Sequence, residues 1–324
     1  MTTLARRLGV YLLTAWVAIT VNFLLPRMMP GNPVRILIGK IHGRVTPQMV
    51  RAIEEQFGVG LHQGLWSQYL HYWDQLFHLN LGVSIALSAP VSSVLKQTVP
   101  WTVGLIGAST VLSFLLGTFV GTYLGWRRGT VFDAVLPVAT FFQAVPYFFF
   151  GTVLLLVFAS HLRWFPELGA YNEALTPHWH WAFVASVLRY GQLPAITVIV
   201  SSVAGWIMGM RNMMVTTVAE DFVLMAVAKG LPKRKVVAYA ARNAVLPSIS
   251  NFSLAMGLLV SGALLVELVF NYPGVGDLLL TAVQNEDYPL LQGIFLVITF
   301  TVLSANLIAD VVYMALDPRI RREA

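Results

Sequence analysis

The sequence predicts an all-α membrane protein with six transmembrane helices. Hydrophobic residues make up 57% of the 324-residue chain and charged residues only 11%, and the mean hydropathy is +0.70. Soluble domains contain about 25% charged residues, so this chain cannot cover a globular surface with polar groups. Six windows are long enough to cross the hydrocarbon core, which takes about 20 apolar residues per helix.

The six windows follow one another along the chain at unequal intervals. They cover residues 8–28, 101–125, 131–159, 191–210, 248–269 and 290–316. The first window follows Arg6 and Arg7, as the apolar region of a signal peptide would. It is long, however, and has no small-residue cleavage site before Pro30. We therefore expect it to be retained as the first transmembrane helix.

The distribution of basic residues predicts the orientation. With the N-terminus in the cytoplasm, thirteen of the 21 Lys and Arg residues fall on the cytoplasmic side. The predicted outer loop 270–289 contains no Lys or Arg, and all seven His residues also fall outside. Cytoplasmic loops of membrane proteins are enriched in Lys and Arg. We expect both termini to be cytoplasmic.

Three regions organise the chain. Residues 1–30 hold the N-terminus and the first span, residues 31–99 form a small extracytoplasmic subdomain, and residues 100–324 form a core with the other five spans. Within the subdomain, Thr46-Pro47 predicts a helix start, because proline suits the first helical position. A second amphipathic stretch covers residues 66–79.

A basic helix pair is predicted between the fourth and fifth spans, within a loop at 218–247. Apolar residues recur at helical spacing from Val218 to Lys229. Gly230 suits the left-handed position after a helix, and Pro232 cannot continue the same helix. A second helix is expected at 233–244. The apolar stripe of the first helix is predicted at Val218, Phe222, Met225 and Ala226, and the exposed basic residues of the second at Lys233, Arg234, Lys235 and Arg242.

Two interpretations of this pair follow from its residues. It could rest on anionic lipid, which attracts basic residues near the surface. Alternatively, a short rigid helix tied at both ends to spans could act as a lever, turning displacement of a partner into rotation of those spans.

The loop resembles a known family. Residues 229–232 (KGLP) followed by 241–247 (ARNAVLP) are similar to the cytoplasmic loop of binding-protein-dependent ABC importer permeases, in the form of the dipeptide/oligopeptide/nickel branch. One departure is that Met225-Ala226-Val227 stands where the family often has an acidic residue and two alanines. Further similar motifs lie in order at 29–33 (MPGNP), 81–84 (LGVS), 90–91 (PV), 100–102 (PWT), 267 with 270–276 (FNYPGVG), 285–289 (NEDYP) and 317–319 (DPR).

This resemblance implies a pore subunit of an ATP-driven importer in a bacterial-type inner membrane. Its substrates would be di- or oligopeptides, with nickel, glutathione or another small solute as the alternative. The implied partners are a second homologous permease, two ATP-binding subunits, an extracytoplasmic substrate-binding protein and membrane lipid, with no nucleic acid. The chain itself would not be an enzyme and would hold no cofactor, because ATP and Mg²⁺ would be bound by the ATPase subunits.

The candidate site residues fall into three groups. The contact that couples the permease to an ATPase subunit is expected at Met225, Ala226, Lys229, Gly230, Leu231 and Pro232. Gln143 and Asn251 are polar residues within spans, which could line a pore or form hydrogen bonds between helices. Residues with a gating or structural role are expected at Glu267, Tyr272, Pro273, Gly274 and Asp310, with structural pairing favoured for the two acids.

Other functions fit the sequence less well. His178 and His180, with His161 nearby, invite a metal site, but no carboxylate completes the spacing and the flanking Trp179 and Trp181 suit a membrane-interface belt. The chain has no Cys and no phosphate-binding G-x-x-x-x-G-K-[ST] motif. An ion-coupled transporter would need ionisable residues at the membrane midplane, and a membrane enzyme would need a nucleophile with its base, or a metal cluster.

Overall fold

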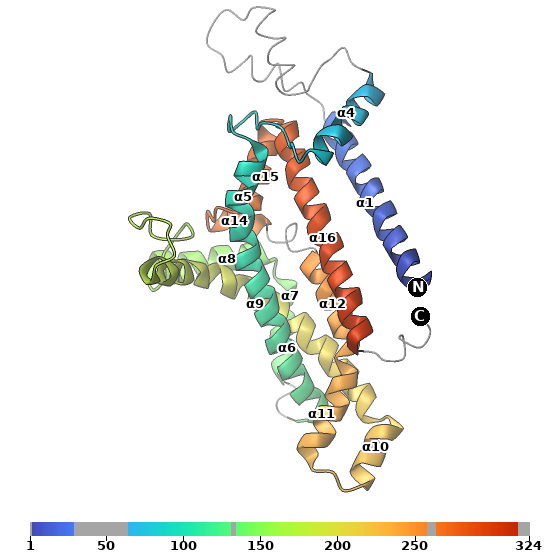
Figure 1. The fold of residues 1–324 in the computed structure, drawn as a ribbon. Helices are drawn as coiled ribbons and strands as arrows, with labels where there is room; N and C mark the ends of the chain where they lie inside the picture. Colours follow the sequence, from blue (N-terminus) through green and yellow to red (C-terminus); the bar gives the residue numbers. More distant parts are fainter. Residues whose placement is uncertain (1, 29–63, 131–133, 258–263, 317–324) are drawn as a thin grey trace, which may run out of the picture. The chain divides into compact units, whose positions relative to one another are not determined.

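The computed structural model describes residues 2–28, 64–130, 134–257 and 264–316, and these residues are mostly helical (Figure 1). Two compact units share the chain. The first contains residues 1–101 and 273–303, and the second contains residues 102–272 and 304–323. Two helices, α5 (Val91–Thr102) and α16 (Tyr288–Leu316), contribute residues to both units.

In the first unit, side-chain hydrogen bonds connect α1 (Thr2–Met28) to its neighbours. The Thr20 hydroxyl lies 2.8 Å from the Tyr69 hydroxyl on α4 (Leu65–Phe77). The Asn22 amide donates to the carbonyl of Gln292 in the first turns of α16 at 2.9 Å. Polar groups in an apolar environment need partners, and these two bonds supply them to the Thr20 hydroxyl and the Asn22 NH₂ group while fixing α1 against α4 and α16.

A buried carboxylate lies between α15 (Val275–Gln284) and α16 in the same unit. Asp287 is completely buried. Its Oδ2 accepts hydrogen bonds from the Ser84 hydroxyl at 2.6 Å and the Ala86 N–H at 2.9 Å, and its Oδ1 accepts one from the Leu290 N–H at 3.1 Å. Asp287 therefore caps the start of α16 and holds the loop before α5 against it.

In the second unit, α6 (Ala108–Trp126) packs closely along α9 (Trp181–Val218). Three glycines spaced four residues apart permit this. A Cβ added at Gly121 would lie 2.5 Å from the Ile207 carbonyl oxygen and 2.8 Å from the Met210 Cβ, and a Cβ at Gly117 or Gly125 would collide with Trp206 or Met214. Small residues let helix backbones approach within a membrane, so this glycine stripe sets the spacing of the two helices.

The third predicted span is broken rather than continuous. Helix α7 (Val135–Ala144) is followed by α8 (Tyr147–Leu154), which runs on as the π-helical segment η3 (Leu155–His161), and the axes bend by 97°. Val145 adopts an extended conformation, as expected for a residue before proline. The break therefore follows from Pro146.

The remaining helices differ in part from the predicted windows. The fourth window, 191–210, is too short, because α9 covers 38 residues, with Pro194 inside it. The fifth window contains α12 (Leu246–Gly257) and α14 (Leu264–Val269), and the residues between them lie outside the described part. The predicted helix start at Thr46-Pro47 also lies outside it. The stretch predicted at 66–79 is helix α4.

The described helices include three long and apolar enough to cross a membrane: 91–126, Trp181–Val218 and 288–308. The bent pair makes a fourth if it is one span. The apolar part of α1, 9–25, is shorter than these three. The chain is thus a mostly helical protein with several membrane-spanning segments.

We expect Gly121→Ala to destabilise the protein by about 1–3 kcal/mol, since an added methyl overpacks the contact with α9. Gly209→Ala is the matched control, because Gly209 lies on α9 with nothing within 4 Å of an added Cβ. Alanine should stabilise α9 there by up to about 1 kcal/mol. Thermal unfolding of the detergent-solubilised protein, followed by tryptophan fluorescence, measures both. Equal melting temperatures for the two variants would contradict the close contact.

We expect Asp287→Asn to destabilise the first unit by about 1–3 kcal/mol, because an amide presents its NH₂ group to N–H and O–H donors and leaves at least one of them unsatisfied. Asp277→Asn is the control, since Asp277 is exposed in the first turn of α15. Hydrogen exchange of the peptide that contains Ala86 reports the loss directly. Unchanged protection there in Asp287→Asn would show that the carboxylate does not hold this loop.

Candidate functional site

The helices α10 (Asp221–Ala228) and α11 (Lys233–Ala244) form a hairpin after α9 (Figure 1). Helix α9 ends at Val218, and Glu220 adopts an extended conformation before α10. The Glu220 carbonyl accepts hydrogen bonds from the N–H groups of Val223 and Leu224. The predicted first helix therefore starts later than Val218, whereas the second matches its predicted bounds, 233–244.

The turn between α10 and α11 is a Schellman motif. Gly230 has φ +74°, as its predicted left-handed position requires. The Gly230 N–H donates to the Val227 carbonyl at 2.9 Å, and the Leu231 N–H donates to the Ala226 carbonyl at 3.2 Å. This pattern satisfies the last carbonyls of α10. Pro232 then starts α11, and its carbonyl accepts hydrogen bonds from the next turn.

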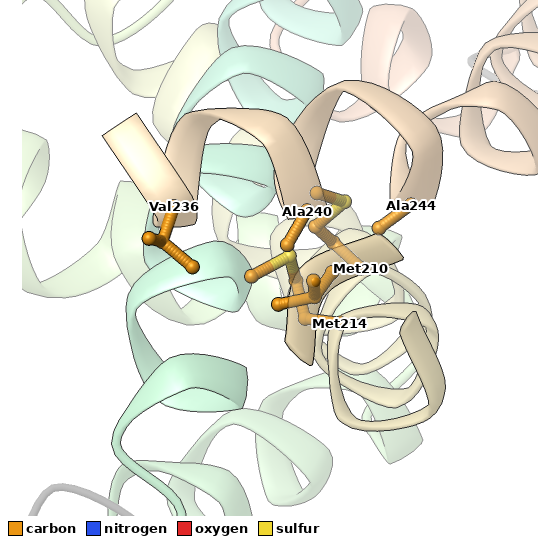
Figure 2. Packing of buried hydrophobic residues seen from close by; sticks show 6 residues of the cluster. Met210, Met214, Val236, Ala240 and Ala244 are labelled. Atoms are coloured by element: carbon orange, nitrogen blue, oxygen red, sulfur yellow. The ribbon is translucent and has the colours of Figure 1, made fainter. Parts of the chain in front are cut away.

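The hairpin rests on the C-terminal half of α9 through a hydrophobic cluster. Met210 and Met214 of α9 are buried against α11, as the labelled side chains in Figure 2 show. The buried members are Met210, Met214, Val223, Val236, Ala240 and Ala244. Ala226 and Leu231, on either side of the Schellman turn, pack against the same cluster. Both helices and their turn are therefore fixed to α9.

The apolar stripe predicted for the first helix is confirmed at Val218 and Ala226, which pack against the cluster, and is wrong at Phe222 and Met225. Val223 is 1% exposed and Ala226 is half-buried, whereas Phe222 is 42% and Met225 57% exposed. The reason is that every residue of α10 after Asp221 is apolar, so periodicity cannot select the buried face. The cluster with Met210 and Met214 selects it instead.

As a result, α10 presents an apolar surface outward. This α10 surface consists of Phe222, Leu224, Met225 and Val227, each at least 42% exposed. Leu224 and Val227 were not among the predicted site residues. The sequence does signal them, because α10 has more apolar residues than one face of a helix can bury.

Basic residues gather at the start of α11 beside this surface. Lys233, Arg234 and Lys235 are exposed and occupy its first turn. Cations at a helix N-terminus oppose the helix dipole, so these residues do not stabilise α11. They are available to an anionic partner, either a protein surface or lipid.

Among the predicted coupling residues, Met225, Lys229, Gly230 and Pro232 are exposed, while Ala226 and Leu231 are half-buried. The structure thus brings all six together at the tip of the hairpin. Four of them face outward, and two anchor the turn to the hydrophobic cluster.

The two predicted pore-lining residues lie on different helices. Gln143 is exposed on α7, and its amide lies 3.3 Å from where a Cβ on Gly205 of α9 would be. Asn251 is exposed on α12. The role of both stays a prediction.

The predicted gating or structural residues are mostly buried. Glu267 is 1% exposed and accepts a hydrogen bond from the Thr102 hydroxyl at 2.6 Å. Tyr272 is buried, and its N–H donates to the Glu267 carbonyl at 2.8 Å. Pro273 is exposed, and Gly274 precedes α15. Asp310 lies on α16, and its side chain is outside the described part.

Within the ranges that the structure describes, no three His, Asp or Glu side chains are grouped so that they could hold a metal ion. His178 and His180 are exposed in the segment before α9. The Nδ1 of His180 lies 3.0 Å from the His178 carbonyl.

Comparison with known proteins covers nearly the whole chain. Residues 103–322 match the model of the family described as binding-protein-dependent transport system inner membrane component. The chain is 33% identical to the di/tripeptide transport system permease protein of Pseudomonas aeruginosa (strain UCBPP-PA14), over 99% of this chain and 98% of the relative. It is 32% identical to the probable D,D-dipeptide transport system permease protein of Escherichia coli (strain K12), over 97% and 95%. A third relative is the glutathione transport system permease protein of Escherichia coli O6:H1, 29% identical over 95% of each chain.

The resemblance inferred from the motifs is confirmed by these matches, which include both the hairpin and the segment from Glu267 to Gly276. The chain belongs to the family of binding-protein-dependent transport system inner membrane components.

Proposed function

We propose that this chain is one of two pore-forming subunits of an ATP-driven importer for short peptides. Support comes from the family match and from relatives whose names specify transport of dipeptides and tripeptides. The partners would be a second homologous permease, two ATP-binding subunits and an extracytoplasmic binding protein. Catalysis of ATP hydrolysis would belong to the ATP-binding subunits, which would also hold ATP and Mg²⁺.

The proposed topology has six spans, with both termini and the hairpin in the cytoplasm. The three long apolar helices and the bent pair supply four spans. We assign the other two to α1 and to the segment that contains α12 and α14. The excess of Lys and Arg around the hairpin supports its cytoplasmic side.

The observation that carries the mechanism is the apolar α10 surface, which stays exposed although α10 is fixed to α9 by buried neighbours. An exposed cluster of large apolar side chains marks an interaction site. We assign this surface, with the Schellman turn beside it, as the contact with an ATP-binding subunit. Movement of that subunit would then be passed to α9 as a rigid displacement.

Peptides are the proposed substrate class. The three relatives named above are described as transporting di- and tripeptides, D,D-dipeptides and glutathione, which is itself a tripeptide. The alternative substrate is nickel or another small solute. The uptake experiment below decides between this alternative and peptides.

Reconstitution tests this function. Liposomes that contain this permease with its second permease and ATP-binding subunits should take up a labelled dipeptide only with the binding protein outside and ATP inside. Excess unlabelled tripeptide should compete, whereas Ni²⁺ should not. Uptake by the permeases alone, or uptake abolished by an uncoupler while ATP remains high, would contradict the proposal and favour an ion-coupled transporter.

We expect Met225→Glu to weaken association with the ATP-binding subunit by roughly tenfold, about 1.4 kcal/mol, because it places a charge in an apolar contact. Transport should fall with it. Ala238→Glu, an exposed position on α11, is the control and should retain both. Copurification of the ATP-binding subunit and dipeptide uptake measure the two effects. Wild-type association in Met225→Glu would remove α10 from the contact.

A further inference from the structure

Helix α4 is apolar and aromatic, yet none of its residues is buried. Its sequence, LWSQYLHYWDQLF, contains five aromatic residues. Side chains of this size normally supply most of the buried area in a core. Their placement on α4 divides the helix into three faces.

The first face packs on α1. The Tyr69 hydroxyl lies 2.8 Å from the Thr20 hydroxyl, and the Tyr69 ring lies edge-on to the Phe23 ring with centroids 5.2 Å apart. The Arg27 Nε donates to the Gln68 side-chain carbonyl at 3.0 Å. These contacts place α4 beside the last three turns of α1, at the end of its apolar segment 9–25.

The second face is apolar, with three exposed residues and one that is half-buried, Trp73. Trp66, Leu70, Trp73 and Phe77 recur at intervals of four, three and four residues, which places them along one side of the helix. Trp66 is 70%, Leu70 53% and Phe77 78% exposed. No charged residue interrupts this side.

The third face is polar and lies on a different side of the helix from the other two. Ser67, His71 and Asp74 are exposed at intervals of four and three residues. An amphipathic helix with one apolar side, one polar side and aromatic residues is typical of a helix that lies in the plane of a bilayer interface. Trp and Tyr prefer the same depth.

The neighbouring surface of α1 identifies what covers the apolar face. Val17, Val21, Leu24 and Leu25 of α1 are each at least 41% exposed, and a helix that crosses a bilayer presents such residues to lipid. Both exposed apolar surfaces therefore lie at the end of α1 near Arg27, where α4 contacts it. Figure 1 shows α4 at the C-terminal end of α1.

We propose that α4 is a membrane-interface helix, with Trp66, Leu70, Trp73 and Phe77 inserted at the boundary between lipid headgroups and acyl chains, and Ser67, His71 and Asp74 in water. This inference rests on the proposed crossing of the membrane by α1. It gives the chain an anchor in lipid at α4, beside the C-terminal end of α1.

Spin labels test the placement, and this chain contains no Cys of its own that would be labelled. Single cysteines at Leu70→Cys and Phe77→Cys report the apolar face, and Ser67→Cys and Asp74→Cys, also exposed, are the matched controls. The assembled transporter is placed in nanodiscs of phosphatidylethanolamine and phosphatidylglycerol. Collision rates of each nitroxide with oxygen, which partitions into lipid, and with a water-soluble nickel chelate are then measured.

The labels at 70 and 77 should collide several-fold more with oxygen than with the chelate, and the labels at 67 and 74 should show the reverse. Equal exposure of all four to the chelate would overturn the proposal. Labels at 70 and 77 that are shielded from both reagents would also overturn it, because a protein partner would then cover this face.

A label at Val17→Cys separates the two levels of inference. If it collides with oxygen while the labels at 70 and 77 lie in water, only the placement of α4 fails. If it too is reached by the nickel chelate, the crossing of the membrane by α1 fails as well.

Discussion

The close approach of α6 to α9 is the contact on which the rest of the second unit depends. Gly117, Gly121 and Gly125 leave no room for a side chain between the two backbones. Hydrocarbon supplies no hydrophobic driving force between helices, so their association relies on dispersion at short range and on hydrogen bonds. The Ser113 and Ser202 hydroxyls, 2.8 Å apart, add one such bond to the same contact.

This contact also determines where the hairpin can sit. Met210 and Met214 face Gly121 and Gly125 with their Cβ atoms, and their side chains fill the cluster beneath α10 and α11. The same two residues therefore belong to the helix pair and to the base of the hairpin. A force applied to the hairpin reaches α6 and α9 without passing through a loop, because packed interiors transmit displacement. This is why a short hairpin can act on a long helix in the proposed mechanism.

How far the sequence predicts this architecture depends on the kind of residue that carries each feature. Gly230 signals its left-handed turn, and α11 has its predicted bounds. Schellman turns of the same kind end α4, α14 and α15, but with Leu79, Asn271 and Glu286 at positive φ, and residues other than glycine give little warning of that conformation.

The exposed side of α10 was unpredictable for a different reason, since its buried side is chosen by Met210 and Met214 of another helix. Burial of Asp287 depends on Ser84 and Ala86, about 200 residues away along the chain.

The buried carboxylates bear on the choice between ATP-driven and ion-coupled transport. An ion-coupled mechanism needs an acid that gains and loses a proton as the pore alternates. Asp287 accepts three hydrogen bonds from one hydroxyl and two backbone N–H groups. The N–H groups can only donate. Protonation of Asp287 would replace an accepting oxygen with an O–H group that faces these donors. Glu267 accepts from Thr102 and, through its backbone, from Tyr272. Both acids thus have structural roles at the ends of helices, which favours the proposed ATP-driven mechanism over ion coupling.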